Sequence, residues 1–164
     1  MSDHRHRIPV ESFAVSVYVA RRNGDQPLWL LMRRTEQGGG FGGIWQQVTG
    51  CLEAGEAPEQ AALREVGEET GLKVVELYSA DAIETFYEPG SRSIWMNPVF
   101  LAIVSDGDVE LSAEHDRFEW LDTQQATDRV PFWQQRNNIE LIRREFFEKT
   151  PCKWLKLFAR EASQ

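Results

Sequence analysis

Three glutamates that share one helical turn constrain this chain more than any other feature of its sequence. The segment 58–70 reads PEQAALREVGEET; its leading proline suits the first turn of a helix, and the glycine that follows suits the C′ position. On such a helix Glu65, Glu68 and Glu69 stand at i, i+3 and i+4 and project from one face. Like charges at these spacings weaken a helix by roughly a few tenths of a kcal/mol per pair. The acidic face must therefore either remain in water or be neutralised by a partner.

The helix alone leaves two interpretations of this face open. The first is a surface helix with surplus acid, although Ala62, Leu63 and Val66 give the segment a packing face and argue against a freely solvated rod. The second is a divalent-cation site, because Mg²⁺ is a hard cation that is often held by a few carboxylates together with substrate phosphates. The residues that flank the helix decide between the two.

The spacing from Gly50 to Leu72, GCLEAGEAPEQAALREVGEETGL, resembles the signature of the Nudix family without a departure. That signature is Gly, five residues, Glu, seven residues, then Arg-Glu-aliphatic-x-Glu-Glu-x-Gly-aliphatic. Such a match arises by chance at roughly one in 10⁹ starting points at ordinary residue frequencies. The nine matching positions are Gly50, Glu56, Arg64, Glu65, Val66, Glu68, Glu69, Gly71 and Leu72.

The resemblance implies a role for each catalytic position of this segment, called here the Nudix box. Glu65, Glu68 and Glu69 match the metal-binding glutamates of the family, and Arg64 and Glu56 match its structural pair, in which the arginine orients the acidic cluster. The implied cofactor is Mg²⁺, with Mn²⁺ as a substitute. Bound ions would polarise the phosphoryl oxygens and lower the pKa of a bound water, and one of the carboxylates could act as the base. The carbonyl of the first glycine of the box matches a further metal ligand.

The rest of the chain predicts strands and helices around the box. Residues 11–20 and 28–34 alternate as strands about a turn at 23–25, and the Gly-rich stretch 37–43 is predicted to be a loop, either a plain connection or a cover for the substrate. Apolar residues at helical spacing predict a last helix over 134–149 that packs on the sheet. Further extended segments are predicted at 44–49, 72–78, 82–87, 93–104 with an interruption near Pro98, and 118–121. The pattern is α+β, or mixed α/β. The resemblance implies the Nudix fold, an α/β/α sandwich around a mixed β-sheet with the box as loop-helix-loop.

Two segments outside the box resemble the bacterial dihydroneopterin triphosphate pyrophosphatases, a group also known for acting on dATP. They are WQQVTG at 45–50 and AEHDRFEWLD at 113–122. This resemblance implies a further metal ligand at Glu114. It also implies substrate contacts at Arg7, Arg33 and Thr49. The implied reaction takes a triphosphate and water to a monophosphate and pyrophosphate.

Ordinary structural roles remain open for several of these residues. Arg33 suits a strand-end charge as well as a substrate contact, and Glu114 suits a surface acid. Trp45 and Trp120 suit core positions more than stacking platforms, and His115 suits a loop position more than a general base.

The composition of the chain limits the kinds of molecule that it is expected to bind. The net charge of 18 − 26 = −8 opposes binding to long nucleic acid, which needs a basic surface, and permits a small phosphorylated substrate if cations are held by the acids. No apolar run approaches the roughly 20 residues that span a bilayer, and residues 1–7 lack the apolar stretch of a secretory signal. The 164 residues predict one domain over 1–164, expected in the cytoplasm; composition does not predict an oligomeric state.

Two rival functions follow from the same residues. A Nudix hydrolase acting on a dinucleoside polyphosphate, an oxidised nucleotide or a nucleotide sugar would carry the same box. A non-catalytic nucleotide sensor on this fold is disfavoured, because such proteins have degraded boxes and every catalytic-type acid is present here. A structural calcium-binding domain is disfavoured further, since no EF-hand-type loop occurs.

Overall fold

The computed structural model describes residues 7–37 and 41–160, in which nine strands form one mixed sheet. The sheet order is β4-β3-β2-β7-β6-β9, with β1 paired to β7, β5 to β2 and β8 to β3. β2 and β7 run parallel, whereas β2 and β3 run antiparallel. The strands are β1 (Val10–Glu11), β2 (Ala14–Asn23), β3 (Gln26–Arg34), β4 (Trp45–Gln46), β5 (Val48–Cys51), β6 (Val74–Glu88), β7 (Ser93–Val104), β8 (His115–Leu121) and β9 (Lys156–Ala159).

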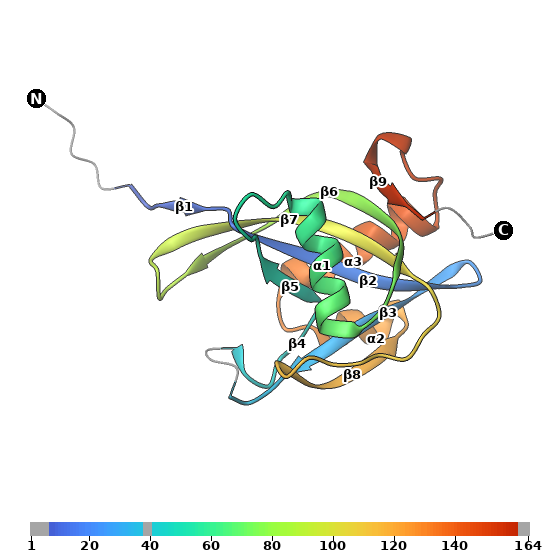
Figure 1. Cartoon of the computed structure of the whole chain (residues 1–164), viewed down its shortest axis with the longest axis horizontal. Coiled ribbons are helices and arrows are strands. Elements are labelled where there is room, and N and C mark those ends of the chain that lie inside the picture. The colour runs from blue at the N-terminus through green and yellow to red at the C-terminus, as the bar shows by residue number, and fades with distance from the viewer. Residues whose placement is uncertain (1–6, 38–40, 161–164) are drawn as a thin grey trace, which may run out of the picture.

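Helices cover both faces of the sheet (Figure 1). α1 (Pro58–Thr70) lies across one face, and α2 (Thr123–Arg129) and α3 (Trp133–Ile142) lie on the other. The predicted α+β class and the sandwich around a mixed sheet are thereby confirmed. β6 and β7 continue beyond the body of the molecule as a ribbon beside β1.

The alternation of side chains along β2 explains why the sheet needs helices on both sides. Val15, Val17 and Val19 belong to the buried cluster that includes the packing face of α1. Tyr18 and Ala20 point to the opposite face and belong to the cluster packed against α2 and α3. With both faces of the strand apolar, water is excluded only when each face is covered, and burial of about 25 cal/mol per Å² of apolar surface supplies the driving force.

α1 begins and ends as the sequence predicts. Pro58 occupies its first position, and the backbone N–H of Ala57 donates to the side chain of Gln60 at 3.0 Å. Gly71 ends the helix in the left-handed region at φ 68°, a conformation that favours glycine. Val66, on the face of α1 that packs against the sheet, is fully buried.

The structure corrects the predicted interruption near Pro98. β7 is continuous through this proline, which faces Ile83 of β6 in the register. The irregularity lies in β6 instead, between Ser79 and Ile83, where Asp81 has a positive φ of 53°. The two segments predicted at 72–78 and 82–87 are therefore one strand with a bulge, which absorbs the extra residues without breaking the ladder.

The C-terminal part differs more from the prediction. α3 ends at Ile142, and a π-helical turn over Arg143–Phe147 replaces the last part of the helix predicted over 134–149. α2 and β9 were not predicted, although Asp122 caps α2 by accepting from the N–H of Gln125 at 2.8 Å, an Asp-x-x-Gln signal that is readable in the sequence. No helix in the described ranges is long and apolar enough to cross a membrane. Residues 38–40, within the predicted Gly-rich loop, lie outside the described residues.

Candidate active site

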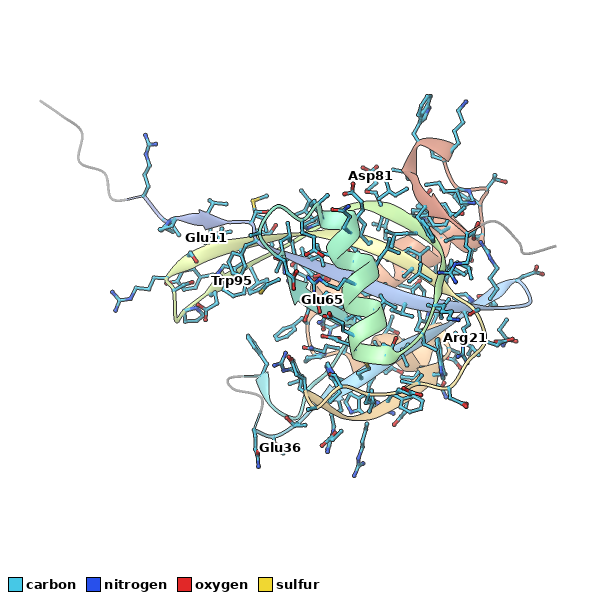
Figure 2. All side chains as sticks on the ribbon, in the orientation of Figure 1. Glu11, Arg21, Glu36, Glu65, Asp81 and Trp95 are labelled. Carbon is cyan, nitrogen blue, oxygen red and sulfur yellow. The ribbon has the colours of Figure 1, made fainter. Side chains whose placement is uncertain are left out.

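β5 and α1 approach each other at the first residue of the Nudix box. A Cβ atom placed on Gly50 would lie 1.9 Å from the carboxyl carbon of Glu65. This separation is far inside van der Waals contact, so only glycine allows the Glu65 side chain to lie against the strand. Glu65 sits midway along α1 where the helix crosses the sheet (Figure 2). The glycine thus places its own backbone beside the first carboxylate of the cluster.

Arg64 organises the acids around it with all five of its N–H donors. It makes two bonds of 2.8 Å to Glu56, one of 2.9 Å to the carbonyl of Cys51, one of 2.8 Å to Glu65 and one of 3.0 Å to Glu68. The Arg64 guanidinium, together with the backbone N–H of Glu53, lowers the pKa of Glu56 to about 2. The predicted pairing of Arg64 with Glu56 is present in the structure.

Glu69 is the most deeply placed acid of the cluster. Its exposed fraction is 6%, and its Oε2 atom is buried without a hydrogen-bond partner among the described residues. The pKa of Glu69 is raised to about 8, mainly by burial and also by the charges of Glu65 and Glu114, against an opposing contribution from Arg34. A buried carboxylate oxygen without a donor is costly in a folded chain, and a bound cation would satisfy it.

The donor set suits a hard divalent cation, although no preassembled group of three ligating side chains occurs among the described residues. The reason is visible in the hydrogen bonds: Glu65 and Glu68 are turned towards Arg64 rather than towards one another. Burial raises the pKa of Glu65 despite that contact, which indicates a carboxylate whose charge is only partly compensated. Carboxylate oxygens from Glu65, Glu68 and Glu69 therefore fit Mg²⁺ or Mn²⁺ by chemistry.

Glu114 joins the cluster from the loop before β8, 45 residues beyond Glu69 in the sequence. Its carbonyl accepts from the N–H of Thr35 at 2.9 Å, and its side chain lies 3.4 Å from Arg34. Its charge contributes to the raised pKa of both Glu65 and Glu69. The structure thus brings Glu114 to the acidic face of α1, where the sequence resemblance places a further metal ligand.

The three predicted substrate contacts lie elsewhere. Arg33 points to the opposite face of the sheet and makes two bonds to Asp116, of 2.8 and 2.5 Å. Thr49 pairs in register with Ser16 and so faces the α3 side, whereas the next residue of β5 faces α1. Arg7 is exposed at the beginning of the described chain. The roles of these three residues in binding remain predictions.

Besides Arg64, two further basic residues, Arg34 and His115, lie on the side of Glu114. Alternation along β3 places Arg34 on the α1 face, and His115 pairs with it in register. His115 is buried, both of its ring nitrogens lack partners within the described part of the chain, and burial lowers its pKa. Neighbouring residues of a strand point to opposite faces of the sheet, so Arg34 and Arg33 lie on different sides. The sequence is enough to tell them apart once it is known which face of β3 packs against α1.

Trp45 and Trp120 have packing roles in this structure. Trp45 packs against the α3-side cluster with the guanidinium of Arg129 at 4.7 Å from its ring centroid, and Trp120 packs against the α1-side cluster with Arg21 at 4.1 Å. Both rings are half-buried, as expected for core positions with one face covered by a cation.

Comparison with known proteins agrees with this site. The family model described as NUDIX domain matches residues 12–149. The chain is 30% identical over 153 residues to the dihydroneopterin triphosphate diphosphatase of Escherichia coli, covering 85% of this chain and 95% of that protein. The crystal structure of a MutT protein from Methanosarcina mazei superposes with a TM-score of 0.70 at 25% identity, covering 86% of this chain and 98% of that one.

A longer relative matches over part of its length. The chain is 41% identical over 128 residues to a Myxococcus xanthus protein named octanoyltransferase, covering 77% of this chain and 35% of that protein. The chain therefore spans about a third of that relative. The fold, the acidic helix and the family model agree on one class of protein, the proteins with a Nudix domain. The chain belongs to the Nudix family.

Proposed function

We propose that this protein is a Mg²⁺-dependent pyrophosphohydrolase of nucleoside or pterin triphosphates, of the dATP or dihydroneopterin triphosphate type. It releases pyrophosphate and leaves a monophosphate. The observation that carries the proposal is the cluster of Glu65, Glu69 and Glu114 on one side of the sheet, with a buried, unpartnered oxygen on Glu69 among the described residues. The E. coli relative named dihydroneopterin triphosphate diphosphatase matches 85% of this chain and supports the substrate class.

Each residue has a defined part in this reaction. Glu65, Glu68, Glu69, Glu114 and the carbonyl of Gly50 would hold the ions. Bound Mg²⁺ or Mn²⁺ supplies polarisation of the phosphoryl oxygens and a lowered pKa for a coordinated water.

The chain's basic residues prepare the acids and bind the substrate. Arg64 fixes the orientation of Glu65 through its 2.8 Å hydrogen bond, while Glu56 and the Cys51 carbonyl hold the guanidinium itself in place. Arg34, beside Glu114, supplies a positive charge that suits a phosphate oxygen. Arg7, Arg33 and Thr49 are proposed to contact the substrate away from the attacked phosphorus.

The test is release of pyrophosphate and phosphate from a panel of dATP, other nucleoside triphosphates, dihydroneopterin triphosphate, diadenosine polyphosphates and ADP-ribose. Each is measured with Mg²⁺, with EDTA and with Glu69→Gln. We expect metal-dependent pyrophosphate release that is strongest with dATP or the pterin and falls at least about 100-fold in the variant. Strongest turnover of a dinucleoside polyphosphate or ADP-ribose would retain the hydrolase and replace the substrate. Binding without turnover by folded protein would establish a sensor.

A further inference from the structure

Gln47 lies at the point where the chain changes its partner strand. Before it, β4 pairs with β3, and Gln46 faces Met32 in the register. After it, β5 pairs with β2, and Val48 faces Val17. Gln47 itself has no register partner in either of these two ladders. Backbone pairing therefore does not hold the chain at the residue where it crosses from one strand to the other.

The side chain of Gln47 is held instead, at both of its ends. The residue is 1% exposed; its NH₂ group donates to the carboxylate of Glu84 on β6 at 3.2 Å, and its oxygen accepts from the NH₂ group of Gln135 on α3 at 2.9 Å. Because a carboxylate only accepts, the charge of Glu84 fixes which way round the amide of Gln47 lies. The side chain thus spans from β6 to α3 in one orientation.

Glu84 also connects Gln47 to the strand that β5 joins. Its carboxylate is buried and accepts from the hydroxyls of Ser16 at 2.6 Å and Tyr18 at 2.5 Å, both on β2. Ser16 pairs in register with Thr49, two residues beyond Gln47. Hydrogen bonds to a charged acceptor are stronger than those between neutral groups. The segment before β5 is therefore tied firmly to the part of β2 with which β5 pairs.

The register of β5 decides what α1 meets on the other face of the sheet. β5 has four residues, and its third, Gly50, leaves room for the carboxyl group of Glu65, which lies 1.9 Å from the position of an added Cβ. A slip of one residue would bring a side chain, that of Thr49 or Cys51, to this position instead. A strand of four residues has few ladder hydrogen bonds to resist such a slip. An anchor directly before the strand supplies the missing resistance.

We infer that Gln47 is a positioning residue for the acidic cluster: it fixes the register of β5 and thereby the place of Gly50 against Glu65. Glu84 is the fixed point to which Gln47 is bound. The inference rests on the proposed function and adds to it two buried residues on the opposite face of the sheet. Neither of them contacts the substrate, because the effect passes along the backbone of β5.

The test compares two substitutions that each remove one donor from Glu84. Gln47→Met removes the donor on the segment that leads into β5 and nearly keeps the side-chain volume. Asn138→Leu is the matched control, because it removes the donor on α3, which lies 2.9 Å from the same carboxylate. Each variant leaves a buried acceptor with one bond fewer, so both should melt roughly 2–8 °C below the wild type.

Binding of Mn²⁺ without nucleotide separates positioning from stability. Substitution of a residue that orients metal ligands from behind typically lowers metal affinity or activity about 10- to 100-fold. Calorimetry should therefore give a Kd for Mn²⁺ at least about tenfold higher in Gln47→Met and close to the wild-type value in Asn138→Leu. The kcat with the preferred triphosphate should fall by a similar factor in Gln47→Met alone. Equal losses in the two variants, or affinity and kcat retained in folded Gln47→Met, overturn the inference.

A second variant keeps the test decisive if Gln47→Met does not fold. Gln47→Asn retains the amide but is one methylene shorter, so it cannot reach Glu84 and Gln135 at once. The affinity for Mn²⁺ should fall in this variant as well, and a wild-type Kd in folded Gln47→Asn would reject the positioning role.

The same measurements distinguish this inference from the proposed function. A wild type that binds Mn²⁺ but turns over no triphosphate, with the affinity lost in Gln47→Met, would reject the proposed function and retain the positioning role. Turnover of triphosphates with the same kcat and the same Kd for Mn²⁺ in both proteins would retain the function and reject the positioning role.

Discussion

A Cβ atom added to Gly50 would lie 1.9 Å from the carboxyl carbon of Glu65. Gly50→Ala must displace this side chain or move β5 away from α1. We expect kcat to fall about 100-fold, the effect of misplacing a reacting group by roughly 1 Å. Steady-state assays with the preferred triphosphate measure it.

Gly67→Ala is the matched control for that substitution. An added Cβ there meets nothing within 4 Å, and the residue lies inside α1. Alanine should raise the free energy of unfolding by up to about 1 kcal/mol and leave kcat unchanged. Full activity in Gly50→Ala would show that Glu65 does not need its place against the strand.

We expect Glu69 to be needed for activity and, when it is ionised, to lower the stability of the metal-free protein. The pKa of this carboxyl is raised from 4.5 to about 8, so between these values the folded state binds a proton that the unfolded state does not. The stability due to this group is present below pH 4.5 and is lost as pH rises through 8. In EDTA at pH 8.5, Glu69→Gln should therefore melt at a higher temperature than the wild type.

The same comparison at pH 4.5 should give nearly equal melting temperatures, because the protonated carboxyl then resembles the amide. Differential scanning calorimetry at both pH values measures the two differences. A wild type that is the more stable protein at pH 8.5 in EDTA would contradict the burial of an uncompensated charge at this position.

At the scale of elements, the loop before α1 is attached to the helix by the Glu56–Arg64 pair. Arg64 lowers the pKa of Glu56 from 4.5 to about 2. The stabilisation is therefore present above pH 4.5 and lost as pH falls towards 2. Glu56→Gln should lower the melting temperature at pH 7, with a difference that shrinks as the pH approaches 2.

Thermal denaturation across this range provides the measurement, and Glu53→Gln provides the control. Glu53 is exposed in the same loop and its side chain is outside the hydrogen bonds of Arg64. A difference for Glu56→Gln that is independent of pH would show that the pair contributes through packing rather than charge.

The elements that sequence patterns predicted well are those defined by local signals. α1 carries its proline, its left-handed glycine and its packing face within 14 residues, and its predicted and observed limits coincide at Pro58–Thr70. The bulge in β6 and the π-helical turn after α3 lack such signals, because each is set by the partner against which the segment packs. β9 forms only because β6 offers it an edge, with Leu77 facing Phe158.

At the scale of the whole molecule, the sheet has one core beneath α1, on the face of the acidic cluster, and a second beneath α2 and α3. A substitution in the second core should therefore change the stability of the protein and leave the chemistry at the acidic cluster unchanged. Ile139 is fully buried under α3, on the face away from the acidic cluster. Ile139→Ala should lower the free energy of unfolding by about 2–5 kcal/mol through lost burial and a residual cavity. Urea denaturation measures the loss, and kcat per folded molecule should remain close to that of the wild type.

A loss of kcat in Ile139→Ala under conditions where the protein is fully folded would contradict this separation. It would show that the packing of α3 is transmitted through the sheet to the Nudix box.

The sequence by itself determined the family, the acidic helix and the identity of the residues in the Nudix box, because these depend on spacings within one short segment. It also predicted a ligand at Glu114, through resemblance rather than through any local rule. Only the tertiary structure decided which of Arg33 and Arg34 lies beside the acids, since that depends on which face of β3 is packed against α1.

The network around Glu84 was likewise invisible in the sequence. Tyr18 and Glu84 are 66 residues apart, and Asn138 lies a further 54 residues along the chain. Hydrogen bonds between such distant segments follow from strand order and register, which are set by the packing of the whole chain rather than by any local preference. Spacing within a segment is written in the sequence, whereas proximity between segments exists only once the sheet has formed.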